Sequence, residues 1–376
     1  MVPIFPVDVL PLPSEDLVGR DGILSDLERR VLQGQSVLIP GPRRVGKSAV
    51  AFELLRRVAD SANALTASVD LFECGDVREL ARKMAAAILA GVDPRWRRLQ
   101  LKTDRAMAEG LRNSEVAVSV LGLDVLRWIY RVERLDTGEL LDRALDLPAA
   151  VSDRLRRPTV MVFDEFQELA ALDPSLGVFK RMRAHWQRTR GAYLFLGSQG
   201  SLVRSLFAQS RMPLYRFADL VPLPRIPADD WVRYITHKFE GAGCPVSPGV
   251  PEELVQRTGG HAFDTMKVLQ AVSRRLPREG GAVTRDVAWL GYVDAARDLG
   301  RYFETEIQAL GLKLSRALLV RLANNQPLYV SDASSSQIHQ TTQGLVTQGI
   351  LKRPRPRRYE FVEPMLAEYL RGRIGS

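Results

Sequence analysis

Short apolar runs recur along the first part of the chain and alternate with segments of helical periodicity. Each run is short enough for one strand and apolar enough to be covered on both faces of a sheet. The predicted strands lie at residues 36–39, 66–71, 159–163 and 192–196. The predicted helices lie at residues 22–32, 49–55, 77–89, 138–145 and 176–190. This alternation is typical of an α/β domain with a parallel sheet and right-handed crossovers.

The strand pattern ends after residue 224, and two regions of different character follow. Several helices, separated by prolines and by the Gly259-Gly260 pair, are predicted in the first of them. The last region predicts helices at 312–322 and 337–348, the start of a short helix at 331–333, and a hairpin of residues 349–352 and 359–362. That layout is typical of a winged helix. The predicted domains are an α/β core at residues 1–224, a helical domain at 225–310 and a winged helix at 311–376.

The first predicted strand leads into a glycine-bounded loop with the pattern G-x-x-x-x-G-K-S, here called the phosphate loop (residues 41–48). The backbone N–H groups of such a loop, together with the positive end of the helix after it, can bind phosphate. Lys47 is expected to reach the β- and γ-phosphates of a nucleotide, and the Ser48 hydroxyl to bind Mg²⁺. A surface turn could match by chance, but the flanking strand and helix favour nucleotide binding. The residues assigned to the nucleotide are Gly41, Pro42, Arg43, Arg44, Val45, Gly46, Lys47, Ser48 and Ala49.

Two carboxylates follow the apolar strand at 159–163. Asp164 and Glu165 are expected at the carboxyl edge of the sheet, where open parallel sheets bind ligands. Asp164 would hold Mg²⁺ and Glu165 would orient or deprotonate the attacking water. An acidic helix cap is the structural alternative. Placed downstream of a phosphate loop, the pair favours an ATPase.

Polar residues after the next strand are further candidates for this chemistry. Ser198 or Gln199 could lie beside the γ-phosphate and align the water, although a turn residue capping the following helix fits equally well. Arg216 could stabilise the charge of the γ-phosphate, within one subunit or across a subunit boundary. Most of the 53 Lys and Arg residues are expected to be surface charge, so spacing alone favours a surface role for Arg216.

Charge, cysteine content and the length of apolar runs indicate the kind of partner and the cellular compartment. The formal net charge is +9 with a pI near 9.7. Ten Lys and Arg against four Asp and Glu fall in residues 311–376, and such a local excess favours nucleic acid as a partner. The two cysteines, Cys74 and Cys244, are far apart in the sequence, which predicts a reduced, cytoplasmic protein. No apolar run reaches the length of a membrane span, and no signal-peptide pattern opens the chain.

The predicted hairpin and the polar helix before it carry the candidate DNA contacts. Cations crowd the hairpin tip, where they suit phosphate contacts, and the helix offers side chains that can reach base edges in a major groove. The residues assigned to double-stranded DNA are Gln337, Gln340, Thr341, Arg353, Arg355, Arg357 and Arg358. A protein-docking surface or a purely structural brace would fit the same layout, so all three interpretations remain open.

Taken together, the motifs resemble a known family. Val18-Gly19-Arg20-Asp21, the phosphate loop, Phe163-Asp164-Glu165-Phe166-Gln167-Glu168-Leu169, Gly197-Ser198 and Thr258-Gly259-Gly260-His261 occur in the expected order. They are similar to the archaeal-type ATPases of the STAND-related branch of AAA-like P-loop NTPases, relatives of the origin-recognition initiators. The resemblance implies bound ATP or ADP, a lid formed by the helical domain, and a C-terminal winged helix.

The resemblance also implies roles for single residues. Gly19 and Arg20 would lie near the adenine, Ser198 would take the sensor position, and Arg216 matches an arginine between the last two core strands. His261 would lie near the nucleotide. Ala262 stands where a proline usually follows this histidine, which puts a phosphate contact of His261 in doubt. The residues alone favour a helix-capping or core histidine.

The sequence therefore predicts an ATP-hydrolysing molecular switch whose basic winged helix binds double-stranded DNA. The alternative is a regulatory or scaffold ATPase whose winged helix docks a protein partner, for example in a defence or mobile-element system. Self-association is compatible with both functions. No sequence feature suggests the second substrate site that a metabolic kinase would need.

Overall fold

The computed structural model describes residues 4–7, 10–72, 74–92, 136–173, 175–188, 191–198, 200–277, 281–310, 313–356 and 358–372. The predictions for Gln199 and Arg357 lie outside these residues. Contacts divide the chain into two compact units. Unit 1 comprises Met1–Asp21, Pro42–Ala49 and Pro224–Ser376, and unit 2 comprises Gly22–Gly41 and Val50–Leu223. The division of the chain at residues 224 and 310 into core, lid and winged helix stays a prediction.

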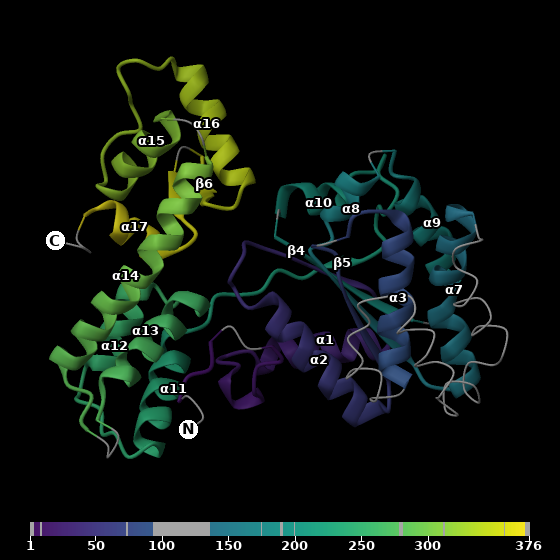
Figure 1. Ribbon diagram of the computed structural model, residues 1–376, viewed down its shortest axis with the longest axis horizontal. Helices are drawn as coiled ribbons and strands as arrows, with labels where there is room; N and C mark the ends of the chain where they lie inside the picture. The colour runs from purple at the N-terminus through teal and green to yellow at the C-terminus, as the bar shows by residue number, and fades with distance from the viewer. Residues whose placement is uncertain are drawn as a thin grey trace. The chain divides into compact units, whose positions relative to one another are not determined.

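Unit 2 contains a five-stranded parallel sheet (Figure 1). Its strands are β1 (Val37–Pro40), β2 (Leu65–Asp70), β3 (Thr159–Asp164), β4 (Ala192–Gly197) and β5 (Asp219–Leu220). Their order across the sheet is β2-β3-β4-β1-β5. The four strands predicted from apolar runs are confirmed, and the short β5 adds an edge strand beside β1.

Helices pack around this sheet. They are α1 (Asp21–Leu32), α2 (Lys47–Ala62), α3 (Val77–Val92), α7 (Thr137–Leu155), α8 (Glu168–Leu172), α9 (Gly177–Trp186) and α10 (Gly200–Ala208). Helix α3 lies between β2 and α7, and α7 contacts α9 (Figure 1). Ser61 of α2 donates a hydrogen bond to Glu28 of α1 at 2.7 Å. The helix predicted at 176–190 is shorter than expected, because α9 ends at Trp186.

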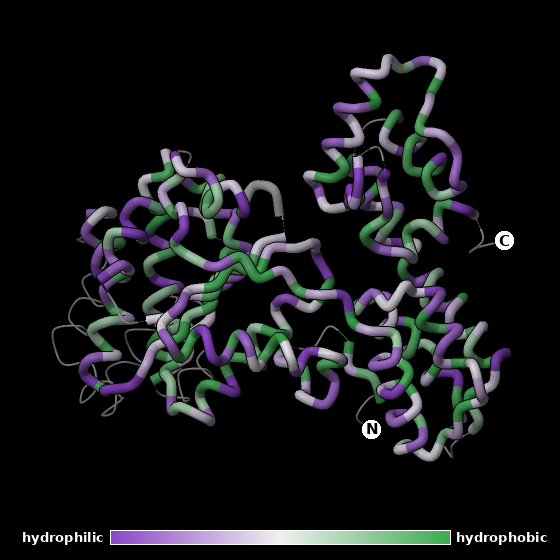
Figure 2. The backbone as a smooth tube through the Cα atoms, turned by 180° about the vertical axis from the view of Figure 1, so that it is seen from behind, coloured by the Kyte–Doolittle hydropathy of each residue, from purple (hydrophilic) through white to green (hydrophobic). Residues whose placement is uncertain are grey.

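Aromatic side chains fill one side of the sheet in unit 2. The rings of Trp186 and Tyr193 stack with centroids 4.2 Å apart, and Phe163 and Phe195 stack at 5.9 Å. Phe166, just after β3, packs against Phe195 at 4.6 Å. The strands form the hydrophobic interior of this unit (Figure 2). This core fixes the ends of β3 and β4, from which the polar residues of the candidate site project.

Unit 1 is mainly helical and ends in a two-stranded hairpin. Its elements include η1 (Ser14–Asp16), α11 (Ala228–Gly241), α12 (Val250–Thr258), α13 (Ala262–Arg275), α14 (Arg285–Ala309), α15 (Lys313–Ala323), α16 (Ser335–Thr347), β6 (Leu351–Arg355), β7 (Arg358–Phe361) and α17 (Pro364–Leu370). The predicted hairpin is confirmed as the antiparallel pair β6-β7. The short helix predicted to start at 331–333 is wrong, since these residues form a turn. A capping box between Ser334 and Gln337 starts α16 after this turn.

The N-terminal segment is tied to α11 by a buried polar group. Asp16 is 4% exposed, and it accepts a hydrogen bond from Tyr234 Oη at 2.6 Å. Lys238 Nζ lies 2.7 Å from Asp16 Oδ1. Burial and the bond to Asp16 raise the pKa of the Tyr234 hydroxyl far above its usual range. The hydroxyl of Tyr234 and the ammonium group of Lys238 both contact Oδ1 and offset the cost of burying this carboxylate.

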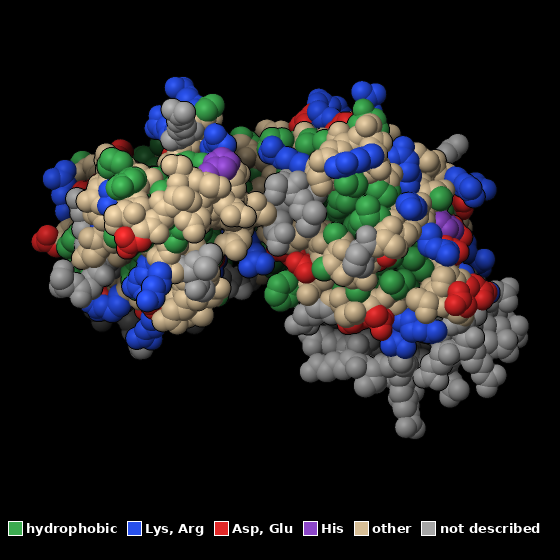
Figure 3. Space-filling view, turned by 90° about the horizontal axis from the view of Figure 1, so that it is seen from above, with side chains coloured by type: hydrophobic (Ala, Val, Ile, Leu, Met, Phe, Trp, Pro, Cys, Tyr) green, Lys and Arg blue, Asp and Glu red, His purple; other side chains and the backbone are tan. Residues whose placement is uncertain are grey.

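Lys and Arg side chains form several separate groups on the face drawn in Figure 3. The net positive charge is therefore not gathered into one field on that face. None of the helices within the described ranges combines the length and the apolar character that crossing a bilayer demands.

Candidate functional site

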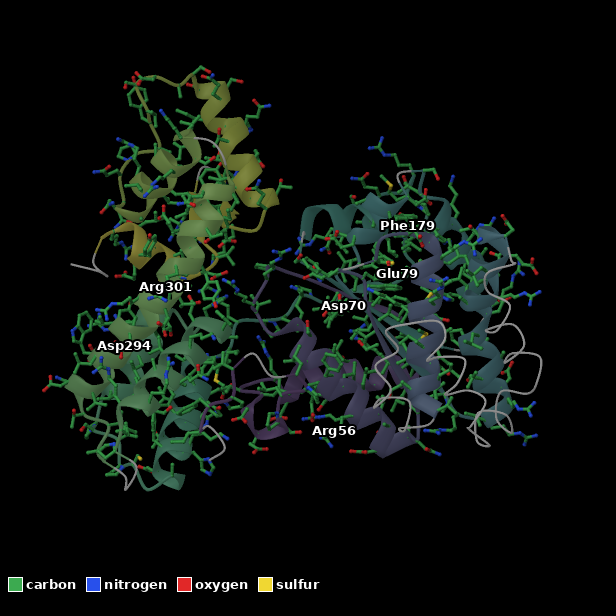
Figure 4. All side chains as sticks on the ribbon, in the orientation of Figure 1. Arg56, Asp70, Glu79, Phe179, Asp294 and Arg301 are labelled. Atoms are coloured by element: carbon green, nitrogen blue, oxygen red, sulfur yellow. The ribbon has the colours of Figure 1, made fainter. Side chains whose placement is uncertain are left out.

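Polar residues collect where the strands of unit 2 end. Because the strands are parallel, their carboxyl ends lie at one edge, where open α/β sheets bind ligands. Pro40, the last residue of β1, pairs with Gly197 of β4, and Asp70 pairs with Asp164. Asp70 is labelled at the end of β2 in Figure 4. The phosphate loop follows β1 in the chain, while Asp164 ends β3 and Ser198 follows β4.

Glu165 and Ser198 meet across the ends of β3 and β4. Ser198 is 6% exposed, and its Oγ donates to Glu165 Oε2 at 2.6 Å. The backbone N–H of Glu165 donates to Asp164 Oδ1 at 2.8 Å. Glu165 has a φ of 49°, a left-handed conformation that costs roughly 1–2 kcal/mol for a residue with a Cβ. The bond from Phe166 N to Leu196 O, 2.9 Å, helps to hold this turn.

Gln167 joins the same cluster, and sequence reasoning assigned it no role. Its side chain is 3% exposed overall, and Nε2 donates to Glu165 Oε2 at 2.5 Å and to Ser198 Oγ at 3.0 Å. The available signal was an uncharged polar residue two positions after Glu165, between Phe166 and Glu168. Two side chains, Gln167 and Ser198, thus donate to one carboxylate oxygen of Glu165.

From Pro42 onward the phosphate loop lies in unit 1, and it has the backbone of an anion-binding turn. Arg44 has a φ of 64° and Gly46 a φ of 92°, and α2 begins at Lys47. Left-handed residues alternating with ordinary ones turn successive N–H groups to one side. Lys47 is 7% exposed, and its Nζ donates to Pro42 O at 2.6 Å. Arg43 and Arg44 are exposed, whereas the half-buried residues are Gly41, Pro42, Val45, Gly46, Ser48 and Ala49.

The turn at Gly19 and Arg20 supports this loop. Gly19 has a φ of 61°, and a Cβ there would lie 2.6 Å from Asp230 Oδ2, so the position requires glycine. Arg20 is 4% exposed and donates to Val45 O at 3.1 Å and to Pro224 O at 2.6 Å. Burial lowers the pKa of Arg20 to about 10. The guanidinium therefore braces a carbonyl of the phosphate loop within unit 1.

His261 is the N-cap of α13. Its Nδ1 accepts a hydrogen bond from Asp264 N at 3.4 Å, and its side chain is 7% exposed. Asp264 is fully buried and accepts from Met365 N at 3.1 Å. In this structure His261 has the helix-capping position that the residues alone favoured, and no described residue bonds to its buried Nε2.

Arg44 contacts the end of the chain within unit 1. Its Nη1 lies 3.0 Å from Glu363 Oε2, and its guanidinium lies over the Phe263 ring, 4.9 Å from the centroid. Glu363 is the N-cap of α17, and its side chain is 12% exposed. Burial raises the pKa of the Glu363 carboxyl above its usual range, while the Arg44 guanidinium opposes that rise. An arginine of the phosphate loop is thus already paired with a carboxylate.

Arg216 lies in unit 2, between α10 and β5. It is exposed, with a φ of 55°, and its guanidinium lies 5.1 Å from the centroid of the Tyr215 ring. Its backbone N donates to Phe207 O at 3.0 Å. These contacts place Arg216 on the surface of its own unit.

The candidate DNA residues lie on α16 and the hairpin. Gln337 Oε1 accepts from Ser334 N at 2.8 Å, so the helix cap uses this side chain. Gln340 is exposed and Thr341 is half-buried. On the hairpin, Arg353, Arg355 and Arg358 are exposed, and Arg355 of β6 pairs with Arg358 of β7 in the strand register. The Arg353 guanidinium lies over the Tyr359 ring. The Arg358 guanidinium lies 3.3 Å from the Glu360 carboxylate.

No protein-family model and no curated protein matches the chain. Among solved structures it is similar to a Walker-type ATPase of Pyrococcus abyssi, with a TM-score of 0.68 and 16% identity over 95% of this chain and 97% of that one. It is also similar to the Aeropyrum pernix ORC2 protein in its ADPNP–ADP complexes, with a TM-score of 0.61 and 13% identity over 98% and 96% of the two chains. The chain has the fold of these two proteins.

This fold confirms the predicted α/β class with a parallel sheet, a helical region and a C-terminal hairpin. The Aeropyrum pernix ORC1 protein, solved in complex with DNA, matches with a TM-score of 0.50 and 17% identity over 97% of this chain and 96% of that chain. At these identities the likeness establishes the fold.

Residues of the phosphate loop and of the strand ends suit a nucleotide and Mg²⁺ by their donor chemistry. The left-handed residues of the phosphate loop shape its backbone for an anion. The Ser48 hydroxyl and the Asp164 carboxylate are oxygen donors, which Mg²⁺ prefers. Within the described ranges, no group of three or more His, Cys, Asp or Glu side chains could hold a metal ion. A metal that arrives with the phosphates of its nucleotide needs no such group.

Proposed function

We propose that this protein is an ATP-binding and ATP-hydrolysing molecular switch. The observation that carries the hydrolytic part is the cluster of Asp164, Glu165 and Ser198 at the carboxyl edge of the sheet. The same edge includes the end of β1, and the phosphate loop follows β1 in the chain. A metal-binding carboxylate, a second carboxylate for water and a polar sensor are the parts that P-loop hydrolysis requires.

Each residue has a distinct task in the proposed reaction. Lys47 and the N–H groups of the phosphate loop bind the β- and γ-phosphates. Ser48 and Asp164 would hold Mg²⁺. A bound Mg²⁺ would neutralise part of the negative charge on the phosphates. Glu165 accepts a hydrogen bond from the attacking water and directs it, and Ser198 holds the Glu165 carboxylate.

Nucleotide binding and turnover by two variants test this assignment. We expect Lys47→Ala to weaken ATP binding. Glu165→Gln should retain binding and lose about 10²- to 10⁴-fold in turnover, since it removes a general base. Glu139→Gln is the matched control, because this glutamate forms an exposed ion pair with Arg143 on α7. Turnover by Glu165→Gln at the rate of the unmodified protein would refute the assignment.

We also propose that the winged-helix region binds double-stranded DNA. The exposed Arg353, Arg355 and Arg358 on one hairpin, next to the polar helix α16, support this proposal. Phosphate contacts make the affinity fall linearly with salt on a log–log scale, with a slope of about 0.9 per phosphate.

Duplex binding measured across a salt series tests the DNA proposal. Replacing Arg355 and Arg358 with Ala should reduce the slope by about two. Arg297→Ala with Arg301→Ala removes the same charge from α14, where Arg301 is labelled in Figure 4, and should leave the slope unchanged. If duplex binding is absent, or shows no salt dependence, the DNA proposal is wrong.

One surface favours the alternative, a protein partner. An open groove of about 640 Å³ on α15 and the following loop is lined by residues that include Arg316, Arg321, Val320 and Tyr329. An exposed tyrosine on an apolar floor rimmed by cations suits an acidic protein segment. Co-purification of a protein with no nucleic acid would favour this function over DNA binding.

The ion pair of Arg44 with Glu363 supports the switching part of the proposal. A nucleotide phosphate and the Glu363 carboxylate are both anions that suit one guanidinium. We therefore infer that nucleotide phosphate competes with Glu363 for Arg44 and loosens the contact with α17. Glu363→Gln should raise the affinity for ATP, whereas the control Glu139→Gln should leave it unchanged.

A further inference from the structure

The Gln167 carboxamide is the least expected part of the candidate site. It lies two residues after Glu165, in the turn between β3 and α8, and is almost wholly buried. Its Nε2 donates to Glu165 Oε2 at 2.5 Å and to Ser198 Oγ at 3.0 Å. Ser198 Oγ in turn donates to the same Glu165 oxygen at 2.6 Å. The three side chains form a closed triangle around one carboxylate oxygen.

The orientation of the Gln167 amide follows from its neighbours. Nε2 also lies 3.3 Å from Glu168 Oε1, so two carboxylate oxygens face this end of the side chain. An ionised carboxylate can only accept a hydrogen bond, and the amino group must therefore be the atom that faces them. The amide oxygen then points into the interior, where no described residue satisfies it.

Two unfavourable features therefore occur side by side. A buried amide oxygen without a partner is costly, and so is a glutamate in the left-handed conformation. The left-handed conformation belongs to Glu165, which carries the carboxylate, and the amide oxygen without a partner belongs to Gln167, which holds that carboxylate. The aromatic packing of Phe166 against Phe195 and Phe179 keeps the intervening residue in place. Such features persist where the surrounding structure enforces them, and they cluster at functional sites.

We propose that Gln167 is a positioning residue, which together with Ser198 fixes the Glu165 carboxylate in one orientation at the sheet edge. The inference rests on the proposed function, because it assigns Gln167 a role only through Glu165. A carboxylate held by two donors loses the freedom to rotate, and its geometry relative to the attacking water is set before the nucleotide arrives.

Three substitutions separate positioning from packing. Gln167→Met keeps the length of the side chain and removes the donor, and we expect kcat to fall about 10- to 100-fold with ADP affinity unchanged. Gln167→Glu places a second carboxylate against Glu165 and should reduce kcat further. Gln167→His keeps an N–H donor and should recover part of the rate. A packing defect would follow the size of the side chain and would show no such rescue by a donor.

A double-mutant cycle gives the decisive readout. In the Glu165→Gln background, Gln167→Met should leave the residual turnover unchanged, because the carboxylate that it positions is gone. An equal additional loss in that background would overturn the inference and indicate a general structural role. Full turnover by Gln167→Met, with Glu165→Gln inactive, would also overturn it while leaving the proposed function intact. Full turnover by the single variant Glu165→Gln would refute both the positioning role of Gln167 and the proposed ATP hydrolysis.

Discussion

Gly291 and Gly344 offer a strong test of the packing of unit 1, because one chemical change should have opposite effects at the two positions. Both glycines lie inside helices, α14 and α16. In an exposed helix interior, Gly→Ala stabilises by about 1 kcal/mol through helix propensity. A Cβ at Gly344 would meet no atom within 4 Å, so Gly344→Ala should realise that gain.

At Gly291 the neighbouring atoms should make the change to alanine destabilising instead of stabilising. A Cβ there would lie 2.5 Å from Val272 Cγ2, 2.7 Å from Val272 Cα and 2.8 Å from Val272 N. The side-chain atom can rotate away, but two of these atoms are backbone of α13, so α13 and α14 must separate. Overpacking of this kind typically costs about 1–3 kcal/mol, and close backbone contacts place Gly291→Ala at the upper end. After the propensity gain of about 1 kcal/mol, we expect a net loss of about 2 kcal/mol.

Hydrogen exchange followed by mass spectrometry reports this local change, because it measures protection peptide by peptide. In Gly291→Ala, peptides from α13 and α14 should exchange faster, whereas Gly344→Ala should slow exchange in α16. Gly300→Ala provides a graded comparison, since its Cβ would meet only the ring of Tyr369, 3.0 Å away. Equal or greater protection in Gly291→Ala would mean that the two helices separate at little cost, which would refute the reasoning.

Two further predictions concern buried polar groups. Burial raises the pKa of the Cys74 thiol to about 11, so alkylation at pH 8 should be roughly a hundredfold slower than for an ordinary cysteine and should rise with pH up to about 11. Mass spectrometry after timed iodoacetamide labelling measures this, and a rate that levels off near pH 9 would contradict it. Asp16→Asn leaves Lys238 without its carboxylate and should destabilise unit 1 by about 3 kcal/mol in urea unfolding. Asp298→Asn, at an exposed ion pair with Arg274, is the control and should change unfolding little.

Local pattern was enough to predict the four longer strands of the sheet. Both faces of a parallel sheet are covered, so each of its strands is apolar along its whole length. The apolar runs therefore predicted β1 to β4 from local sequence alone. The helix start at α16 was harder, although the capping box leaves a signal in Ser334 and Gln337. Sequence reasoning assigned Gln337 to DNA bases instead, because a polar side chain suits both a cap and a groove.

Contacts between distant residues could not be predicted in this way. The register of β3 against β4 brings Glu165 to Ser198, and no local pattern near either residue records that register. Arg44 and Glu363 are 319 positions apart in the chain and meet only in the folded unit. The chemistry of the side chains predicted which residues could take part in a site. Tertiary packing decides which of these residues come into contact.

The pairing of Arg44 with Glu363 has a thermodynamic consequence for the proposed switch. If nucleotide phosphate and Glu363 compete for one guanidinium, then binding of ATP and seating of α17 on that guanidinium oppose each other. Linkage makes this coupling reciprocal, so a partner that draws Glu363 away from Arg44 must raise the affinity for ATP by the same factor that ATP raises the affinity for the partner. Glu363→Gln weakens the competition from the protein side and should therefore shrink both effects together. Coupling between ATP and the partner that persists undiminished in Glu363→Gln would show that the two sites communicate by a different route.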